Sequence, residues 1–94
     1  MKYEINDYVI TMEEETHRQN MWLYKSKIVE INDNIVTIID LYSYNKKTNH
    51  IKNEQKTRES EMPKNTIPKS CIISKVSRSF NFKNFNQTHP EYLL

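Results

Sequence analysis

Short runs of apolar and β-branched residues, separated by polar turns, recur along the chain. Residues 8–12 form the first run, and residues 22–31 form the second. Alternation of apolar and polar positions over so few residues is typical of strands rather than helices. In the second run the apolar side chains change from one alternating set to the other at its middle, which favours a bulge or strong bend. The pattern predicts a short first strand and a longer, bent second strand.

Asn32, Asp33 and Asn34 separate the second run from residues 35–44, which are rich in Ile and Tyr. The chain contains no glycine, and Asn and Asp are the residues that next best tolerate a positive φ. This trio is therefore the strongest hairpin signal in the sequence. It predicts that the runs on either side of it pair antiparallel.

Polar residues dominate two further segments. Residues 13–20 have no apolar stripe that a helix would bury, so they predict an exposed loop. Residues 45–66 fit a solvent-facing helix, an edge strand or a loop, and we expect a long polar loop with an edge strand near residues 50–57.

Apolar residues return at 70–76 and predict the closing strand, with Pro68 at its first residue or on an edge.

The end of the chain, residues 79–94, is predicted to be an aromatic C-terminal tail that docks onto a domain formed by residues 1–78. Its phenylalanines alternate with polar residues, as in a short strand followed by a loop. A chain of 94 residues cannot divide its apolar residues between two independent cores. We therefore expect a single small domain with a tail.

Composition narrows the classes of function. The absence of glycine removes Gly-rich phosphate loops and dinucleotide-binding fingerprints. The lone Cys71 cannot close an internal disulfide, and no spacing of Cys and His supplies four zinc ligands, so we expect no cofactor and no metal site. The three histidines stand isolated, and nothing assembles a nucleophile with a base, which argues against an enzyme.

The same composition bears on origin and location. A lack of glycine and alanine beside many Asn, Lys and Ile residues is typical of an AT-rich gene, as in phages and mobile elements. No apolar run approaches the roughly 18 residues that a membrane span needs. We expect a cytoplasmic protein without membrane contact, in the host cytoplasm if it is viral.

Charge is distributed unevenly beneath a net charge of +2. Residues 1–45 carry four Lys or Arg against eight Asp or Glu, and residues 46–94 carry ten against four. A basic half attracts phosphates or an acidic protein surface, and the alternative is an ordinary solvated face. The basic residues least mixed with acids are Lys64, Lys69, Lys75, Arg78 and Lys83.

Residues 21–44 carry a resemblance to a known family. Trp22 and Tyr24 lead one strand, the Asn and Asp turn follows, and the next strand ends in Asp40, Leu41 and Tyr42. With the order of the predicted strands and loops, this pattern resembles the SH3-like barrels, and among them the Tudor branch. The resemblance implies a mainly β fold, a small five-stranded SH3-like antiparallel barrel. The glycines that help such barrels bend are missing.

Two aromatic groups are candidate binding sites. Trp22, Tyr24, Tyr42 and Tyr44 would form a cage for a methylated ammonium, or a platform for a base, if they met at one end of the hairpin with Asp40 as counter-charge. The alternative is that these rings fill the core.

The second group is in the tail, where Phe80, Phe82 and Phe85 interleave with Arg78 and Lys83 as in platforms for single-stranded nucleic acid. The alternative is that the phenylalanines cover an open sheet edge, within the same chain or across a homodimer.

The leading hypothesis is a non-enzymatic interaction protein, encoded by a phage or mobile element, that binds and inhibits a larger host or defence protein or protein–nucleic acid complex. Anti-CRISPR proteins are analogous in size and composition. The alternatives are a nucleic-acid-binding SH3-like module that uses the basic second half, and a Tudor-like reader of methylated side chains. The expected contact residues are Trp22, Tyr24, Tyr42, Tyr44, Lys64, Lys69, Lys75, Arg78, Phe80, Phe82 and Lys83.

Overall fold

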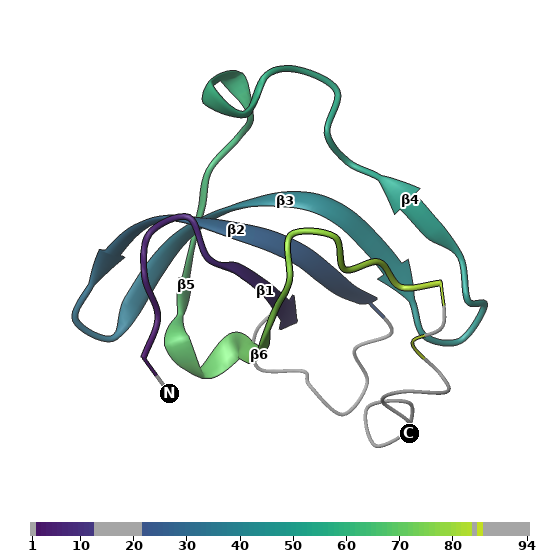
Figure 1. Cartoon of the computed structure of the whole chain (residues 1–94), viewed down its shortest axis with the longest axis horizontal. Coiled ribbons are helices and arrows are strands. Elements are labelled where there is room, and N and C mark those ends of the chain that lie inside the picture. The colour runs from purple at the N-terminus through teal and green to yellow at the C-terminus, as the bar shows by residue number, and fades with distance from the viewer. Residues whose placement is uncertain (1, 13–21, 84, 86–94) are drawn as a thin grey trace.

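Strands dominate the described part of the chain (Figure 1). The computed structural model describes residues 2–12, 22–83 and 85, so the predictions for residues 13–20 and for the chain beyond residue 85 lie outside it. Nothing in the described ranges forms a helix that is long and apolar enough to cross a membrane. The elements are β1 (Tyr8–Met12), β2 (Trp22–Asn32), β3 (Ile35–Asn45), β4 (Ile51–Asn53), the 3₁₀ helix η1 (Glu59–Glu61), β5 (Asn65–Pro68), the 3₁₀ helix η2 (Lys69–Cys71) and β6 (Ile72–Val76).

All the strand pairings are antiparallel, and the order in the sheet is β4-β3-β2-β1-β6. Strand β5 pairs with residues 35–38 of β3 and β4 pairs with residues 42–44, so both lie on the edge of β3 that faces away from β2. The predicted mainly β fold is confirmed. The described sheet has six strands rather than the expected five, because the segment between β3 and β6 supplies two short strands instead of one. The sheet is not closed into the expected barrel.

The hairpin of β2 and β3 is the longest element, with eleven residues in each strand. Asp33 has a φ of 45° in its turn, a conformation that Asp adopts more readily than most residues. The pairing register shifts twice. Leu41 of β3 is an extra residue opposite Lys25 and Ser26, and Val29 is an extra residue in β2 between Ile28 and Glu30. The predicted hairpin and the predicted bulge are both confirmed.

The closing strand β6 begins at Ile72, because residues 69–71 form η2. It pairs with β1, which brings the last strand beside the first. Pro68 ends β5 at the edge of the sheet, where a missing N–H is tolerated. The connection from β4 to β5 arches away from the sheet (Figure 1), and an ion pair of 2.7 Å between Lys27 and Glu59 ties it to β2.

Both faces of the sheet bury apolar side chains. Consecutive residues of a strand point to opposite faces, and the neighbours Val9 and Ile10 belong to different core clusters. The described part of the predicted tail packs into the second of these clusters. The first cluster contains Val9, Ile28, Val36, Ile38 and Ile72, and the second contains Ile10, Leu23, Tyr44, Phe82 and Phe85.

Candidate functional site

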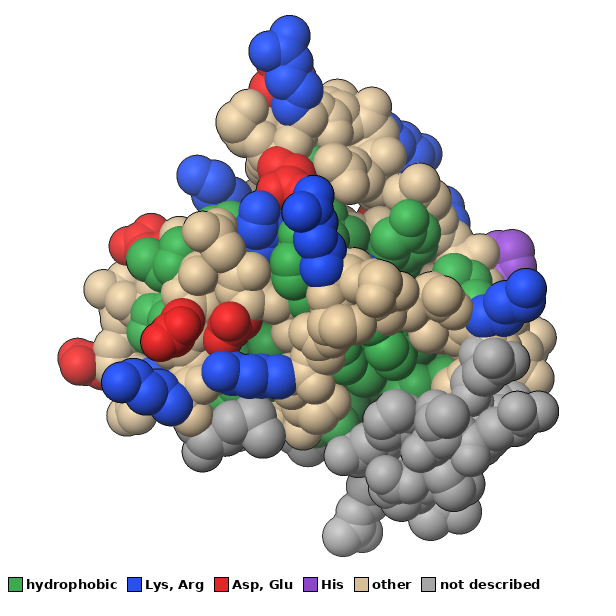
Figure 2. Space-filling view, in the orientation of Figure 1, with side chains coloured by type: hydrophobic (Ala, Val, Ile, Leu, Met, Phe, Trp, Pro, Cys, Tyr) green, Lys and Arg blue, Asp and Glu red, His purple; other side chains and the backbone are tan. Residues whose placement is uncertain are grey.

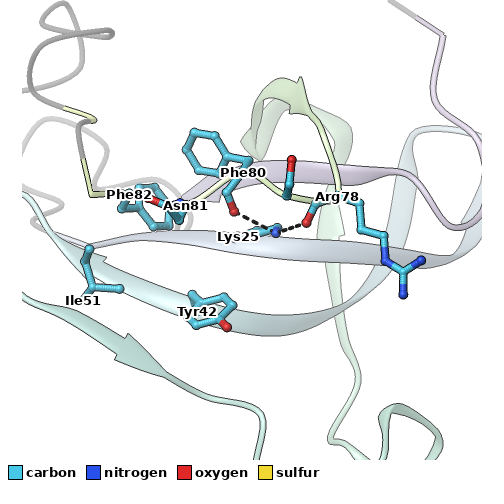
Figure 3. Close-up of a pocket in the computed structure, with 8 residues that line it drawn as sticks. Lys25, Tyr42, Ile51, Arg78, Phe80, Asn81 and Phe82 are labelled. Atoms are coloured by element: carbon cyan, nitrogen blue, oxygen red, sulfur yellow. Dashed lines mark hydrogen bonds between the residues drawn. The ribbon is translucent and has the colours of Figure 1, made fainter.

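A pocket of about 350 Å³ opens where β2, β3 and β4 meet the segment that follows β6 (Figure 3). Lys25 comes from β2, Tyr42 from β3 and Ile51 from β4. Lys25 and Tyr42 are partners in adjacent strands, so their side chains share one face of the sheet. Residues 78–82 complete the lining.

Lys25 lies at the centre of this pocket and is only 5% exposed. Its Nζ donates hydrogen bonds to the backbone carbonyls of Arg78, at 2.6 Å, and Phe80, at 2.8 Å. A buried ammonium needs such acceptors, because losing its water shell without replacement is costly. Desolvation by burial lowers the pKa of Lys25 below its ordinary value. Lys25 thus ties the segment after β6 to the middle of the sheet.

Aromatic rings flank the same ammonium. Its Nζ lies 5.2 Å from the ring centroid of Tyr8 and 5.9 Å from that of Tyr42. These distances lie within the range of about 6 Å in which a ring face attracts a cation. Of the eight residues that line the pocket, Lys25 and Arg78 are cations and none is a carboxylate. The pocket therefore combines apolar walls with positive charge that no lining acid offsets.

Two phenylalanines fix the segment after β6 in place. The ring of Phe82 is stacked on Tyr44, with centroids 4.9 Å apart and an interplanar angle of 5°. Phe80 meets Phe82 edge-on at 5.1 Å and is only partly buried. Phe82 is 2% exposed and Tyr44 is 1% exposed. The structure thus places two of the predicted contact residues in the core rather than on the surface, because burying large rings against each other is strongly favourable.

The mouth of the pocket carries exposed groups of two kinds. Ile51 is 37% exposed, although it is a large apolar residue. Arg78 is also exposed, and its guanidinium points away from Lys25 (Figure 3). The mouth therefore offers a partner an apolar contact and a cation.

The predicted cage of four rings is not assembled. In the β2–β3 ladder Tyr24 lies opposite Ser43, whereas Tyr42 lies opposite Lys25. Because side chains alternate between faces, this register sends Trp22 and Tyr24 to the face opposite that of Tyr42. Only Tyr42 of the four rings lines the pocket.

Asp40, the expected counter-charge of the cage, is part of a polar chain instead. Its carboxylate accepts hydrogen bonds from Ser26 at 2.7 Å and from Asn65 at 3.2 Å. The hydroxyl of Ser26 also lies 2.9 Å from that of Thr11. These contacts join β1, β2, β3 and β5, so this carboxylate has a structural role.

The predicted basic residues do not gather into one patch. Figure 2 shows Lys and Arg side chains scattered among acidic and uncharged ones on this face. Lys75 forms an ion pair with Asp7 at 3.1 Å, and Lys69 is half-buried in η2. Lys64 and Lys83 are exposed on separate segments, and of the predicted basic residues only Arg78 lines the pocket.

Sequence reasoning missed Lys25 and Ile51 as members of the site. A signal for Lys25 was present, because it shares an alternating row with Leu23 and therefore points to a buried face. Ile51 gave no comparable signal, since it stands alone in a polar segment. Its place beside the pocket depends on the pairing of β4 with β3.

The chemistry of the pocket suits binding, with apolar walls, a fixed buried cation and a second cation at the mouth. In the described ranges no three His, Cys, Asp or Glu side chains lie together as metal ligands would. No protein-family model, curated protein or solved structure matches the chain.

Proposed function

We propose that this chain is a non-enzymatic interaction protein that binds and inhibits a larger protein through the pocket and the adjoining strand β4, together called the pocket face. The observation that carries the proposal is the pocket itself, in which partly buried rings and an exposed Ile51 surround the buried ammonium of Lys25. An apolar surface with a few fixed polar groups is typical of protein recognition sites.

The strand beside the pocket supports a protein partner. All three residues of β4 are exposed, and within the described chain the strand pairs with β3 alone. An unpaired strand edge can accept a strand from another chain, so that backbone hydrogen bonds add to side-chain contacts. A partner that paired with β4 would lie beside Ile51, which also lines the pocket.

An SH3-like ancestry of the sheet belongs to the same proposal. Strand β6 returns to pair with β1, and the short helix η2 links it to β5. A meander whose last strand meets its first has the connectivity that a small barrel needs. These pairings support an open SH3-like sheet.

Composition and size support the biological setting of this proposal. The chain has the AT-rich amino-acid usage of phage and mobile-element proteins, and 94 residues suffice for one contact surface. A small protein that covers a functional surface of a host or defence protein inhibits it by exclusion. We place this activity in the host cytoplasm.

Nucleic acid and methylated side chains are supported less well as targets. The ring of Phe82 is buried, which removes it from the expected platform, and Lys75, although exposed, is paired with Asp7. The rings of Tyr24 and Tyr42 lie on opposite faces of the sheet, and a cage needs its rings on one face.

The test is affinity capture from an extract of the native host, with and without nuclease. The chain should retain the same protein after nuclease treatment. Ile51→Glu should abolish capture, because it removes the apolar contact at the mouth and adds a negative charge there. Ile5→Glu is the matched control, since Ile5 is 56% exposed and precedes β1, away from the pocket lining.

Two outcomes would contradict the proposal. Loss of all capture after nuclease treatment would indicate a nucleic-acid target. Equal capture by Ile51→Glu and the unaltered chain would show that the contact surface lies outside the pocket face.

A further inference from the structure

The charge inside the pocket lacks an ionic partner in the lining. Lys25 faces rings, aliphatic carbons and uncharged polar groups, and the exposed guanidinium of Arg78 points away from it. Buried lysines are seldom left without an acid nearby, because carbonyl dipoles offset an ammonium charge only in part. The pocket is therefore electrostatically complementary to an anion.

The hydrogen bonds of Lys25 leave capacity for that anion. An ammonium has three N–H donors, and two of those on Lys25 reach the carbonyls of Arg78 and Phe80. The third can be donated to a group that enters the pocket between Tyr42 and Phe80. Arg78 at the mouth adds attraction for the same negative charge.

The rest of the lining suits an apolar group. Rings of Tyr42, Phe80 and Phe82 and the side chain of Ile51 supply its walls. A volume of about 350 Å³ is at the small end of ligand pockets, which suits a single large side chain with its flanking atoms. An anion alone would leave these walls without a contact.

We propose that the pocket receives an aromatic or aliphatic side chain of the partner protein that lies next to a carboxylate, with the carboxylate bound by Lys25 and the apolar side chain packed against Tyr42, Ile51 and Phe80. This inference rests on the proposed protein-binding function and specifies the chemistry that the pocket face recognises. The partner segment is acidic and carries one large apolar anchor.

The experiment uses two small probes that differ only in charge, 3-phenylpropanoate and its neutral amide, 3-phenylpropanamide. Each is titrated into the full-length isotope-labelled chain while NMR follows the methyl signal of Ile51 and the amide signal of Phe80. The carboxylate should bind about tenfold more tightly than the amide, as is usual for a hydrogen bond between charged groups.

Substitutions test whether the preference for the carboxylate probe over the amide arises in the pocket. Lys25→Met should remove it, and Arg78→Gln should weaken it severalfold while leaving the backbone carbonyl that Lys25 uses. Lys64→Gln is the control, because it also removes one positive charge but lies next to β5, which pairs with the end of β3 that is far from Tyr42. It should leave the affinities for both probes unchanged. If Lys25→Met does not fold, the two probes on the unaltered chain and on Arg78→Gln still test the inference.

Equal affinity for the two probes, or a preference that Lys25→Met leaves intact, would overturn the inference and make Lys25 a purely structural tie. If partner capture still depends on Ile51 in that case, the proposed function stands and only the chemistry of recognition is wrong. If the carboxylate preference holds while Ile51→Glu still captures the partner, the pocket binds such groups but the proposed function fails.

Discussion

At the scale of single residues, Lys25 connects the packing of the chain to its candidate site. A lysine in an alternating row with Leu23 points to a buried face, where its ammonium must find acceptors. The acceptors are main-chain carbonyls of the segment after β6, so burying this charge also positions Phe80 over the sheet. The structural tie and the centre of the pocket are the same side chain.

The ring of Phe82, stacked on Tyr44, supports a prediction about the stability of the fold. Phe82→Ala should lower the free energy of unfolding by about 3–5 kcal/mol, because it empties a core site against Tyr44. Phe80→Ala is the matched control and should cost less, since Phe80 is only partly buried. Equilibrium denaturation measures both.

An unchanged free energy of unfolding in Phe82→Ala would contradict the core position of this ring and revive a surface role. Should Phe82→Ala fail to fold, Phe82→Leu keeps most of the apolar volume and is measured in its place.

At the scale of elements, the β2–β3 hairpin shows how closely local sequence can set local structure. Its turn forms without glycine because Asp33 accepts a φ of 45°. The strands beside the turn are rich in β-branched residues, which favour extended backbone. Local preference and long-range pairing agree here, and so the hairpin could be predicted.

This turn supports an element-scale prediction. Asp33→Val should destabilise the chain by about 1–2 kcal/mol, because a β-branched side chain clashes with the backbone at positive φ. Asn34→Val should cost less, since Asn34 does not have a positive φ. The melting temperatures of the two variants provide the comparison, and equal losses would show that the positive φ at residue 33 is not what limits the turn.

Of the two short edge strands, β4 lies within the edge strand expected near residues 50–57, whereas β5 was not expected. Ile51 and its neighbours carry no alternating pattern, and β4 exists because β3 offers a free edge there. Strand β5 uses the other end of the same edge. Pairing with a distant strand, rather than local preference, decides such elements.

At the scale of the whole molecule, the pairing of β1 with β6 brings the first and last described strands of the chain side by side. An ion pair of 3.1 Å between Asp7 and Lys75 supports this junction. The backbone amide of Glu4 also donates a hydrogen bond of 2.8 Å to the Asp7 carboxylate. The Glu4 hydrogen bond and the Lys75 ammonium hold the pKa of Asp7 below its ordinary value, against a partial opposing effect of burial.

The lowered pKa predicts how stability depends on pH. The charged form of Asp7 is favoured by folding, so its contribution is present above the ordinary pKa of 3.8 and is lost as pH falls through the lower folded value. The difference in unfolding free energy between the unaltered chain and Asp7→Asn should therefore shrink as the pH falls below about 4. Denaturation at several pH values measures it.

Asp33→Asn is the control for this pH series, because Asp33 is exposed in the hairpin turn. A difference for Asp7→Asn that stays constant down to the lowest pH tested would show that its charge does not stabilise the junction.

Part of the candidate site was predicted from the sequence, and part of it was not. Tyr42, Arg78, Phe80 and Phe82 were expected contact residues and do line the pocket. Lys25 and Ile51 were missed because the first looks like an ordinary charged strand residue and the second stands alone in a polar segment. What makes them a site is proximity across strands, which residue type does not encode.

The sequence by itself determined the mainly β fold and the hairpin around Asp33, because alternating apolar positions and turn residues act through the local backbone. Only the tertiary structure decided which face each ring occupies, since the extra residue Leu41 in β3 changes the face of Tyr42 and Tyr44. It also decided that Phe82 fills the core and that Lys25 lies beneath Phe80. The Lys25 hydrogen bonds join residues more than 50 positions apart, where burial and pairing rather than local preference determine the outcome.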